Sequence, residues 1–192
     1  MPATIERLAI SDVLLITPAV HGDPRGAFAE TYSRRELAEA GFTGEFVQDN
    51  HSRSPQKGTV RGLHFQLPPH AQDKLLRVTR GAILDVAVDL RSGSPTWGRH
   101  VAVELSADNW RQLLVPKGFA HGFQTLTDDC EVLYKVTDYY TPSAERGLLW
   151  NDPALAIDWP IEAANAVINT RDAAWPGLAD VGEPFASASG AP

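Results

Sequence analysis

Residues 82–90 alternate strictly between two kinds of side chain. The even positions are all apolar, whereas the odd positions include two carboxylates, Asp85 and Asp89. Successive side chains of a β-strand point to opposite faces, so a period of two predicts a strand with one apolar face. Residues 100–105 and 130–139 alternate in the same way and predict two further strands.

Short apolar stretches of strand length recur along most of the chain, separated by scattered Gly and Pro. They predict further strands at residues 13–16, 28–32, 46–52, 59–66, 74–80, 112–115 and 120–127. A capping box at Ser33 and Glu36, with Gly41 as a stop signal, predicts one helix, and residues 161–166 suit a second, short one. Many short strands with little helix predict an all-β sandwich or barrel.

The length of 192 residues and the composition suit one globular domain. We expect this domain to span residues 1–181, because residues 182–192 are rich in Ala, Ser, Gly and Pro and predict a flexible tail. The single cysteine, Cys130, excludes an internal disulfide and fits a reducing, cytoplasmic location. We expect Cys130 to serve packing.

Charge and hydropathy exclude several classes of partner. The formal net charge of −7 disfavours nucleic acid, because duplex-binding proteins usually display a basic face. No apolar run approaches the length of a membrane span, and the N-terminus does not resemble a signal peptide, so no membrane is expected. A small anionic partner would need its positive charge from a few placed residues.

His64 is the first candidate for chemistry, in the run Arg61-Gly62-Leu63-His64-Phe65-Gln66. A histidine inside an apolar strand, beside an arginine, suits proton transfer, because free imidazole has a pKa of about 6.5. The alternative is a core histidine whose ring is satisfied by a backbone carbonyl. This hexapeptide alone favours neither interpretation.

His121 is the second candidate, because residues 116–123 contain the pattern Pro-x-Gly-x-x-His of the second cupin motif. Metal-binding cupins supply His-x-His and a nearby Glu from their first motif. Here that motif has Gln66 in place of the second histidine, and no Glu follows within reach. Two imidazoles without a carboxylate make a poor transition-metal site, so we predict no metal. His70, in a Pro-rich loop, is expected to be solvated.

A set of ordered motifs resembles the dTDP-4-dehydrorhamnose 3,5-epimerase family over about residues 10–178. The matching runs are residues 23–30, 46–52, 61–66, 74–78, 81–90, 116–123, 134–140, 145, 150–153 and 159–160. The resemblance implies a cupin double-stranded β-helix, or jelly roll, with a few short peripheral helices. It also implies conversion of dTDP-4-dehydro-6-deoxy-D-glucose to dTDP-4-dehydro-L-rhamnose in deoxysugar biosynthesis.

This epimerisation needs a base, a positive group that holds an enolate, and an acid on the opposite face. The C4 ketone already acidifies the protons on C3 and C5, so no cofactor is required. The resemblance implies His64 as base, Asp172 as its partner, Lys74 at the enolate oxygen and Tyr134 as proton donor. From the residues alone, Tyr134 suits a packed core tyrosine and Lys74 an edge-strand lysine.

Further residues match the family's substrate contacts. They are Arg25, Glu30, Gln48, Asn50, Arg61, His121, Tyr140, Glu145 and Arg171. Arginines suit a diphosphate, and Tyr140 matches the ring that stacks on thymine, although Tyr139 stands beside it. The resemblance implies a homodimer whose N-terminal strands bring Phe28 or Arg25 to the neighbouring site. Without it, Arg25 suits a turn and Glu145 a solvated charge.

Three positions depart from what the family or a regular strand would have. Arg171 stands where the family usually has a lysine, which puts that substrate contact in doubt. The loop at residues 54–57 is one residue longer than the common form. Arg61 and His64 have opposite parity on a strand, so they serve one site only if Gly62 permits a bulge or they reach different parts of the ligand.

Three other functions remain open alongside the double epimerase. The first is a mono-epimerase acting at C3 or C5 of another dTDP-deoxysugar, since such relatives share catalytic residues. The second is a metal-dependent cupin dioxygenase or isomerase, which Gln66 argues against. The third is a non-catalytic sugar-nucleotide binding module, which would cause no exchange of substrate protons with solvent.

Overall fold

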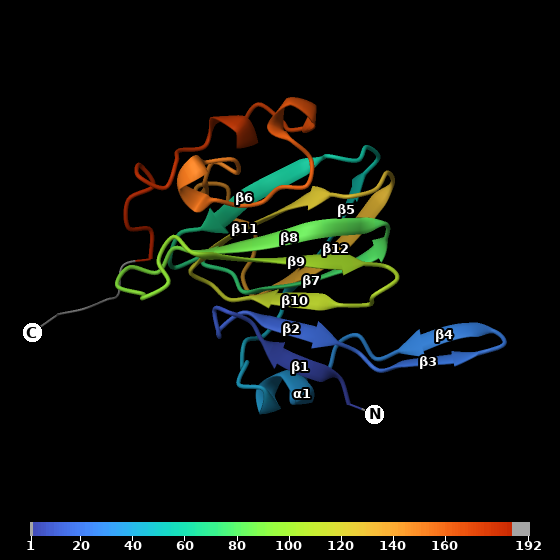
Figure 1. The fold of residues 1–192 in the computed structure, drawn as a ribbon. Helices are drawn as coiled ribbons and strands as arrows, with labels where there is room; N and C mark the ends of the chain where they lie inside the picture. Colours follow the sequence, from blue (N-terminus) through green and yellow to red (C-terminus); the bar gives the residue numbers. More distant parts are fainter. Residues whose placement is uncertain (1, 186–192) are drawn as a thin grey trace, which may run out of the picture.

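The computed structural model describes residues 2–185 and consists of two antiparallel sheets facing each other, with a hairpin beside them (Figure 1). The six-stranded sheet has the order β1 (Thr4–Arg7), β2 (Leu14–Thr17), β10 (Gln112–Val115), β7 (Lys74–Arg80), β12 (Cys130–Val136), β5 (Gln48–Ser54). The five-stranded sheet has the order β13 (Glu145–Gly147), β6 (Val60–Gln66), β11 (Phe119–Thr125), β8 (Ala82–Asp89), β9 (His100–Ser106). This double sheet confirms the expected all-β jelly roll.

A buried apolar cluster fills the space between the two sheets. It includes Leu15, Leu76 and Val132 from one sheet and Ile83, Ala87 and Phe123 from the other. In β8, therefore, the odd positions that carry Asp85 and Asp89 face the interior. The wholly apolar even face, with Val86 and Val88, packs on the other side against the C-terminal segment.

The C-terminal segment covers the outer face of the five-stranded sheet, where Figure 1 draws it in orange and red over β6. It contains three short 3-10 helices, η1 (Pro153–Leu155), η2 (Ala163–Asn165) and η3 (Asp172–Ala174). The expected short helix at residues 161–166 corresponds to η2. Phe185, within the expected tail, packs 5.5 Å from the ring of Phe65. The remainder of that tail, residues 186–192, lies outside the described residues.

The helix α1 (Arg34–Glu39) covers the outer face of the six-stranded sheet. It begins where the sequence predicts, because the Ser33 hydroxyl accepts a hydrogen bond from the Glu36 backbone N–H at 3.4 Å. The Glu36 carboxylate instead accepts from the Ala3 backbone N–H at 3.3 Å, tying the helix to the N-terminus. Leu37 packs against Leu14 and other apolar residues of the sheet. Neither α1 nor any other described helix has the length and apolar character needed to cross a membrane.

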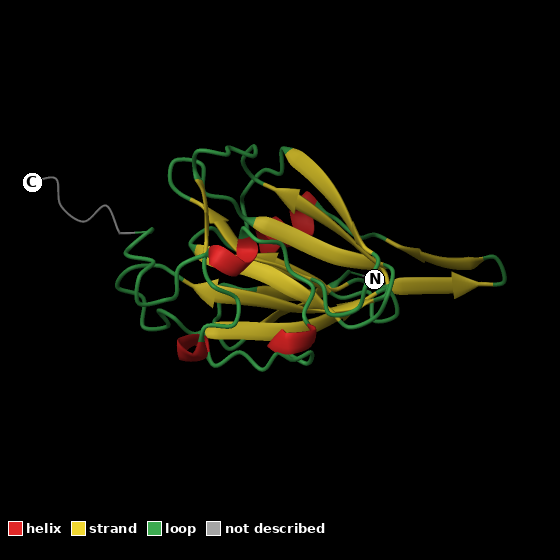
Figure 2. Ribbon diagram, turned by 90° about the horizontal axis from the view of Figure 1, so that it is seen from above, coloured by secondary structure: helices red, strands yellow, loops and turns green. Residues whose placement is uncertain are grey.

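The strands β3 (Val20–Asp23) and β4 (Gly26–Ala29) form a hairpin that extends away from the two sheets, as Figures 1 and 2 both show. Pro24 and Arg25 make the turn between them. The strand expected at residues 28–32 is therefore wrong in its bounds, because the turn signal joins two strands rather than preceding one. Phe28 is 71% exposed on this hairpin.

Other differences from the expected strands concern short or polar elements. Two strands are not among the expected ones: β1, which is polar, and β13, which has three residues. The strand expected at residues 130–139 ends at Val136, where the chain turns and the Asp138 carboxylate accepts from the Tyr139 backbone N–H at 2.7 Å. Cys130 is buried, as expected, with its thiol 3.2 Å from the Ala82 carbonyl oxygen.

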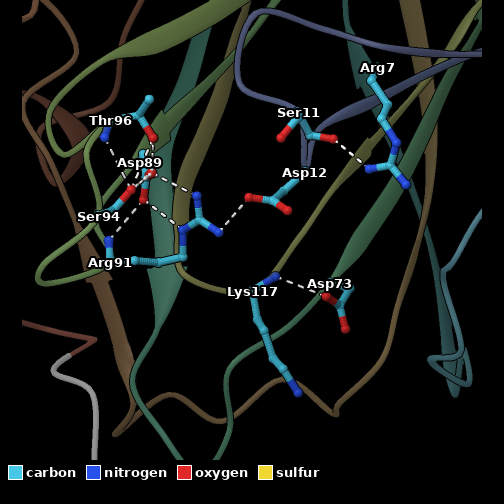
Figure 3. Close-up of polar contacts among 9 residues, drawn as sticks. All are labelled: Arg7, Ser11, Asp12, Asp73, Asp89, Arg91, Ser94, Thr96 and Lys117. Carbon is cyan, nitrogen blue, oxygen red and sulfur yellow. Dashed lines mark hydrogen bonds and ion pairs between the residues drawn. The ribbon is translucent and has the colours of Figure 1, made fainter. Parts of the chain in front are cut away.

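Asp89 anchors the loop that joins β8 to β9, as the close-up in Figure 3 shows. Its carboxylate accepts hydrogen bonds from Arg91, Ser94 and Thr96, with the Ser94 hydroxyl at 2.7 Å and the Thr96 hydroxyl at 2.6 Å. Burial raises the pKa of Asp89, but these donors outweigh burial and hold it at about 2. Arg91 also donates to Asp12 at 2.7 Å, so the network joins the loop to the N-terminal region.

Candidate active site

A cavity of about 280 Å³ lies between the two sheets and gathers most of the predicted site residues. Those that line it are Arg61, His64, Lys74, His121, Tyr134, Tyr140, Glu145, Arg171 and Asp172. His64 comes from β6 of the five-stranded sheet, whereas Tyr134 comes from β12 and Lys74 from β7 of the six-stranded sheet. His64 and Tyr134 thus approach the cavity from opposite walls.

His64 and Asp172 form a hydrogen-bonded pair. The Nε2 atom of His64 lies 2.8 Å from Oδ1 of Asp172, which belongs to η3. The backbone N–H of Gly62 donates to the other carboxylate oxygen at 3.2 Å, and the Asn169 side chain accepts from the Asp172 backbone N–H at 2.7 Å. Burial raises the pKa of Asp172, but the hydrogen bond and charge of His64 outweigh it, so the net shift is downward. Asp172 is therefore held as an anion.

An irregularity at Gly62 lets the side chains of Arg61 and His64 point to the same side of β6, although a regular strand would place them on opposite sides. Val60, Leu63 and Phe65 all pack on the outer side of β6, which requires the alternation to switch between Val60 and Leu63. The pairing of β6 with β11 shifts register at this point, and Gly62 has a φ of +128°. The bulge foreseen at Gly62 therefore brings Arg61 and His64 to the same cavity.

Lys74 lies in the interior of its sheet, because β7 is flanked by β10 and β12. The alternative of an edge-strand lysine is wrong for this reason. The ammonium group donates to the His64 carbonyl oxygen at 3.1 Å. Burial lowers the pKa of Lys74 to about 8, against the opposing effects of the charges of Asp85 and Glu145.

Tyr134 packs against the core cluster, as a tyrosine alternating with Val132 and Val136 should, and it also lines the cavity. Both interpretations of this residue are thus compatible with its position. Burial raises the pKa of Tyr134, and the charge of Arg61 partly opposes that rise. Its phenol is therefore protonated at neutral pH.

A polar cluster borders the cavity around Glu145. Its Oε2 atom accepts from the Tyr140 hydroxyl at 2.8 Å and from Nη1 of Arg171 at 2.8 Å. The Glu145 side chain is only 14% exposed, so the alternative of a solvated charge is wrong. Tyr140 lines the cavity, whereas Tyr139 is not among the lining residues.

Five predicted residues lie outside the cavity lining of this chain. Gln48 and Asn50 share one face of β5 and lie beside the border of the cavity. Gln48 accepts a hydrogen bond from the backbone N–H of Tyr140, a lining residue, at 3.2 Å, and donates one to the Asn50 side chain at 2.9 Å. Arg25 and Phe28 lie on the projecting hairpin, and Arg25 pairs with Asp23 of the same turn. Glu30 follows the hairpin and is exposed.

Several residues at the site were not predicted from the sequence. Ser52, Leu76, Phe123 and Asn169 line the cavity. The first three stand inside runs that match the family, whereas Asn169 lies three positions before Asp172. Alternation from Gln48 and Asn50 points to Ser52 on the same face of β5. Asp85 lies behind the cavity, 2.6 Å from Nε2 of His121. Two signals marked it in the sequence, its position on a strongly alternating strand and its place inside the matching run 81–90.

Gln66, at the position of a cupin metal ligand, instead holds the backbone of neighbouring loops. Its side chain donates to the His70 carbonyl oxygen at 2.7 Å and accepts from the Thr141 backbone N–H at 2.7 Å. His70 is half-exposed and lies 3.3 Å from an Asp138 oxygen. Across residues 2–185, no three His, Cys, Asp or Glu side chains group in a way that could hold a metal ion.

Comparisons with known proteins all find sugar-nucleotide epimerases. The family model described as dTDP-4-dehydrorhamnose 3,5-epimerase matches residues 7–180. A relative of that name from Pseudomonas aeruginosa is 55% identical over 159 residues, covering 82% of this chain and 87% of its own length. A dTDP-6-deoxy-D-glucose-3,5-epimerase from Legionella pneumophila, in complex with dTDP-4-keto-L-rhamnose, has a TM-score of 0.89 at 45% identity, covering 93% of this chain and 94% of its own. A 3'-monoepimerase from Streptomyces bikiniensis, in complex with dTDP-quinovose, has a TM-score of 0.84 at 34% identity. The match covers 91% of this chain and 87% of that one.

Proposed function

Because the chain belongs to the dTDP-4-dehydrorhamnose 3,5-epimerase family, we propose that it inverts C3 and C5 of dTDP-4-dehydro-6-deoxy-D-glucose to give dTDP-4-dehydro-L-rhamnose. The observation that carries the proposal is the opposition of two groups across one cavity. The His64–Asp172 pair lies on one sheet wall, and Tyr134, with Lys74, lies on the other. Inversion of a carbon requires proton removal and return on opposite faces.

Proton abstraction is assigned to Nδ1 of His64. Asp172 engages Nε2, so Nδ1 is the nitrogen free to take the proton from C3 or C5. The electron pair of the broken C–H bond moves to the C4 oxygen and forms an enolate. The buried carboxylate fixes the ring orientation and stabilises the imidazolium that results.

Lys74 steadies the enolate oxygen, and Tyr134 returns the proton. A protonated ammonium in a mostly buried setting stabilises developing negative charge more strongly than water does. The phenol of Tyr134 is protonated at neutral pH, because burial raises its pKa. Donation from the wall opposite His64 gives the inverted carbon.

Binding is shared among charged and aromatic groups at the border of the cavity. Arg61 and Arg171 hold the diphosphate, since the planar guanidinium forms two hydrogen bonds to such groups. Tyr140 stacks on the thymine ring. Glu145, His121, Gln48 and Asn50 contact the remaining polar groups of the substrate. These few cations explain how a chain of net charge −7 takes an anionic ligand.

The projecting hairpin belongs to the site of a second copy in a homodimer. It carries Arg25 and Phe28 away from the sheets of its own chain, and an exposed aromatic on a projecting strand pair suits an interface. Glu30 follows the hairpin into the same interface. In this dimer, each cavity is completed by the hairpin of the partner. The single-cysteine composition keeps the predicted location cytoplasmic.

Mixing two inactive variants tests the dimer. A mixed dimer of His64→Ala and Arg25→Ala contains one site with both defects and one site with neither. Activity is therefore restored on mixing if Arg25 acts in the partner's site. Mixing without restoration, although the subunits exchange, would place Arg25 in its own chain's site or outside both sites.

Proton NMR of the reaction in deuterium oxide tests the chemistry. The proposal predicts deuterium at both C3 and C5 and the product with both centres inverted. Exchange at one carbon alone would make the chain a mono-epimerase, and the absence of exchange would make it a binding module. Loss of activity with chelators, restored by one metal, would establish a metal-dependent cupin instead.

A further inference from the structure

A second imidazole–carboxylate pair lies behind the cavity. The Nε2 atom of His121 on β11 is 2.6 Å from Oδ1 of Asp85 on β8. Asp85 is completely buried and His121 is 6% exposed. A carboxylate inside the sandwich is costly unless its charge is compensated, so its position calls for an explanation beyond packing.

The two pairs are neighbours in the five-stranded sheet. His121 lies directly opposite His64 in the pairing of β11 with β6. Both rings use Nε2 toward a buried carboxylate, so both leave Nδ1 as the remaining nitrogen. One pair is the proposed base, whereas the other has no role in the proton transfers described above.

The hydrogen bond to His121 engages only one oxygen of Asp85. Oδ2 is buried and has no hydrogen-bond partner among the described residues. Two basic groups bear on Asp85, His121 directly and Lys74 through its charge. Burial lowers the pKa of His121, which favours the neutral ring, so Lys74 is the positively charged one of these two groups.

We propose that Asp85 is a positioning residue of the reaction, which orients His121 through Nε2 and supplies the buried negative charge that balances Lys74. This inference rests on the proposed function, in which Lys74 stabilises the enolate. The ionised Asp85 accepts the Nε2 proton of His121 in a hydrogen bond. Nδ1 of His121 is thereby left as an acceptor for a substrate hydroxyl.

The charge on Lys74 depends on every group that faces it. The titratable and charged groups that line the cavity with Lys74 are Arg61, His64, His121, Tyr134, Tyr140, Glu145, Arg171 and Asp172, and the charge of the buried Asp85 also acts on Lys74. Of the two carboxylates that raise the pKa of Lys74 against burial, Asp85 has the larger effect and Glu145 the smaller. Removing the charge of Asp85 therefore shifts the deprotonation of Lys74 to lower pH.

The variant Asp85→Asn tests this role, because it keeps the shape of the side chain and removes its charge. We expect kcat to fall by about tenfold or more, as for the loss of a preorganised charge. The basic limb of the pH profile of kcat should move to lower pH, with KM little changed. Asp89→Asn is the matched control, since Asp89 is buried on the same face of β8 but bonds to Arg91, Ser94 and Thr96. It should lower Tm and leave the pH profile unchanged.

An Asp85→Asn enzyme with the kcat and basic limb of the parent enzyme would overturn the inference while leaving the proposed function intact. If that variant does not fold, 15N NMR of His121 in the parent enzyme decides. The expected tautomer carries its proton on Nε2, and a proton on Nδ1 would overturn the assignment. If the parent enzyme exchanges no substrate proton, the proposed function fails, and the tautomer still tests the positioning of His121.

Discussion

The imidazole of His64 meets the carboxylate of Asp172 at 2.8 Å, although 108 positions separate the two residues in the sequence. The contact joins the central part of β6 to η3, which lies in the segment covering the outer face of that sheet. The Gly62 backbone N–H donates to the other carboxylate oxygen, and the Asn169 side chain accepts from the Asp172 backbone N–H. The pair is therefore a fixed feature of the fold rather than a flexible surface contact.

Replacing His64 with alanine should nearly abolish turnover. Loss of a general base costs about a hundredfold to ten-thousandfold in rate. Binding of dTDP, measured by calorimetry, should remain close to that of the parent enzyme, because the diphosphate contacts lie elsewhere. His70→Ala is the control, since His70 lies outside the cavity lining and should keep full activity. A His64→Ala enzyme within tenfold of the parent would exclude His64 as the base.

Replacing Tyr134 with phenylalanine should separate proton removal from proton return. The ring still packs against the core, so the fold is kept, but the hydroxyl that we propose as the proton donor is lost. Deuterium exchange into recovered substrate should persist while formation of the inverted product slows by about a hundredfold. Equal loss of exchange and of inversion would mean that Tyr134 has a different role.

Turnover should fall as the pH rises through about 8, because Lys74 then loses the positive charge that we propose stabilises the enolate. The variant Lys74→Met removes this titration and should be slow at every pH. Initial rates of the parent enzyme across neutral and alkaline pH provide the measurement. A rate that stays constant well above this pH would show that the charge of Lys74 is dispensable.

Deprotonation of Lys74 should lower turnover but raise the stability of the fold. Lys74 has a pKa of about 8 in the folded protein, against an ordinary lysine pKa of 10.5 in the unfolded chain, so the unfolded chain binds more protons between these values. Stability therefore rises with pH in this window. The free energy of unfolding of the parent enzyme, relative to Lys74→Met, should increase from the lower to the upper end. A constant difference would contradict the shifted pKa.

Arg171 should contribute to substrate binding more than to stability. Its ion pair with Glu145 at 2.8 Å involves a half-exposed arginine, and such pairs contribute only about 0–1 kcal/mol. Arg171→Gln should leave Tm nearly unchanged and raise KM about tenfold, with Arg171→Lys in between. An unchanged KM in Arg171→Gln, measured by initial rates, would show that this residue does not contact the substrate.

Gly62 should tolerate no side chain. A Cβ at this position would lie 2.6 Å from the Gly122 Cα and 2.8 Å from the His121 carbonyl oxygen, at a φ of +128°. Gly62→Ala should destabilise the protein by about 3 kcal/mol, as strained or overpacked positions do. Gly93→Ala is the control, because Gly93 also has a positive φ but open space around it. Equal losses in the two variants, measured by denaturant unfolding, would show that the close approach to β11 is unimportant.

Alternation predicted the central strands well because their pattern is local. β7 and β10 have the bounds expected from apolar runs, and β8 differs by one residue at its end. Elements whose residues are polar or few, such as β1 and β13, carry no such pattern. Their strand structure comes from pairing with β2 and β6.

The sequence by itself determined the all-β class and the helix start at Ser33, and its family resemblance predicted a set of site residues. Only the tertiary structure decided which of these residues share one cavity. The switch of parity at Gly62 brings Arg61 and His64 together, and the pairing of β8 with β11 brings Asp85 to His121. Side-chain periodicity is fixed by adjacent residues, whereas these contacts depend on bulges and strand pairings between distant parts of the chain.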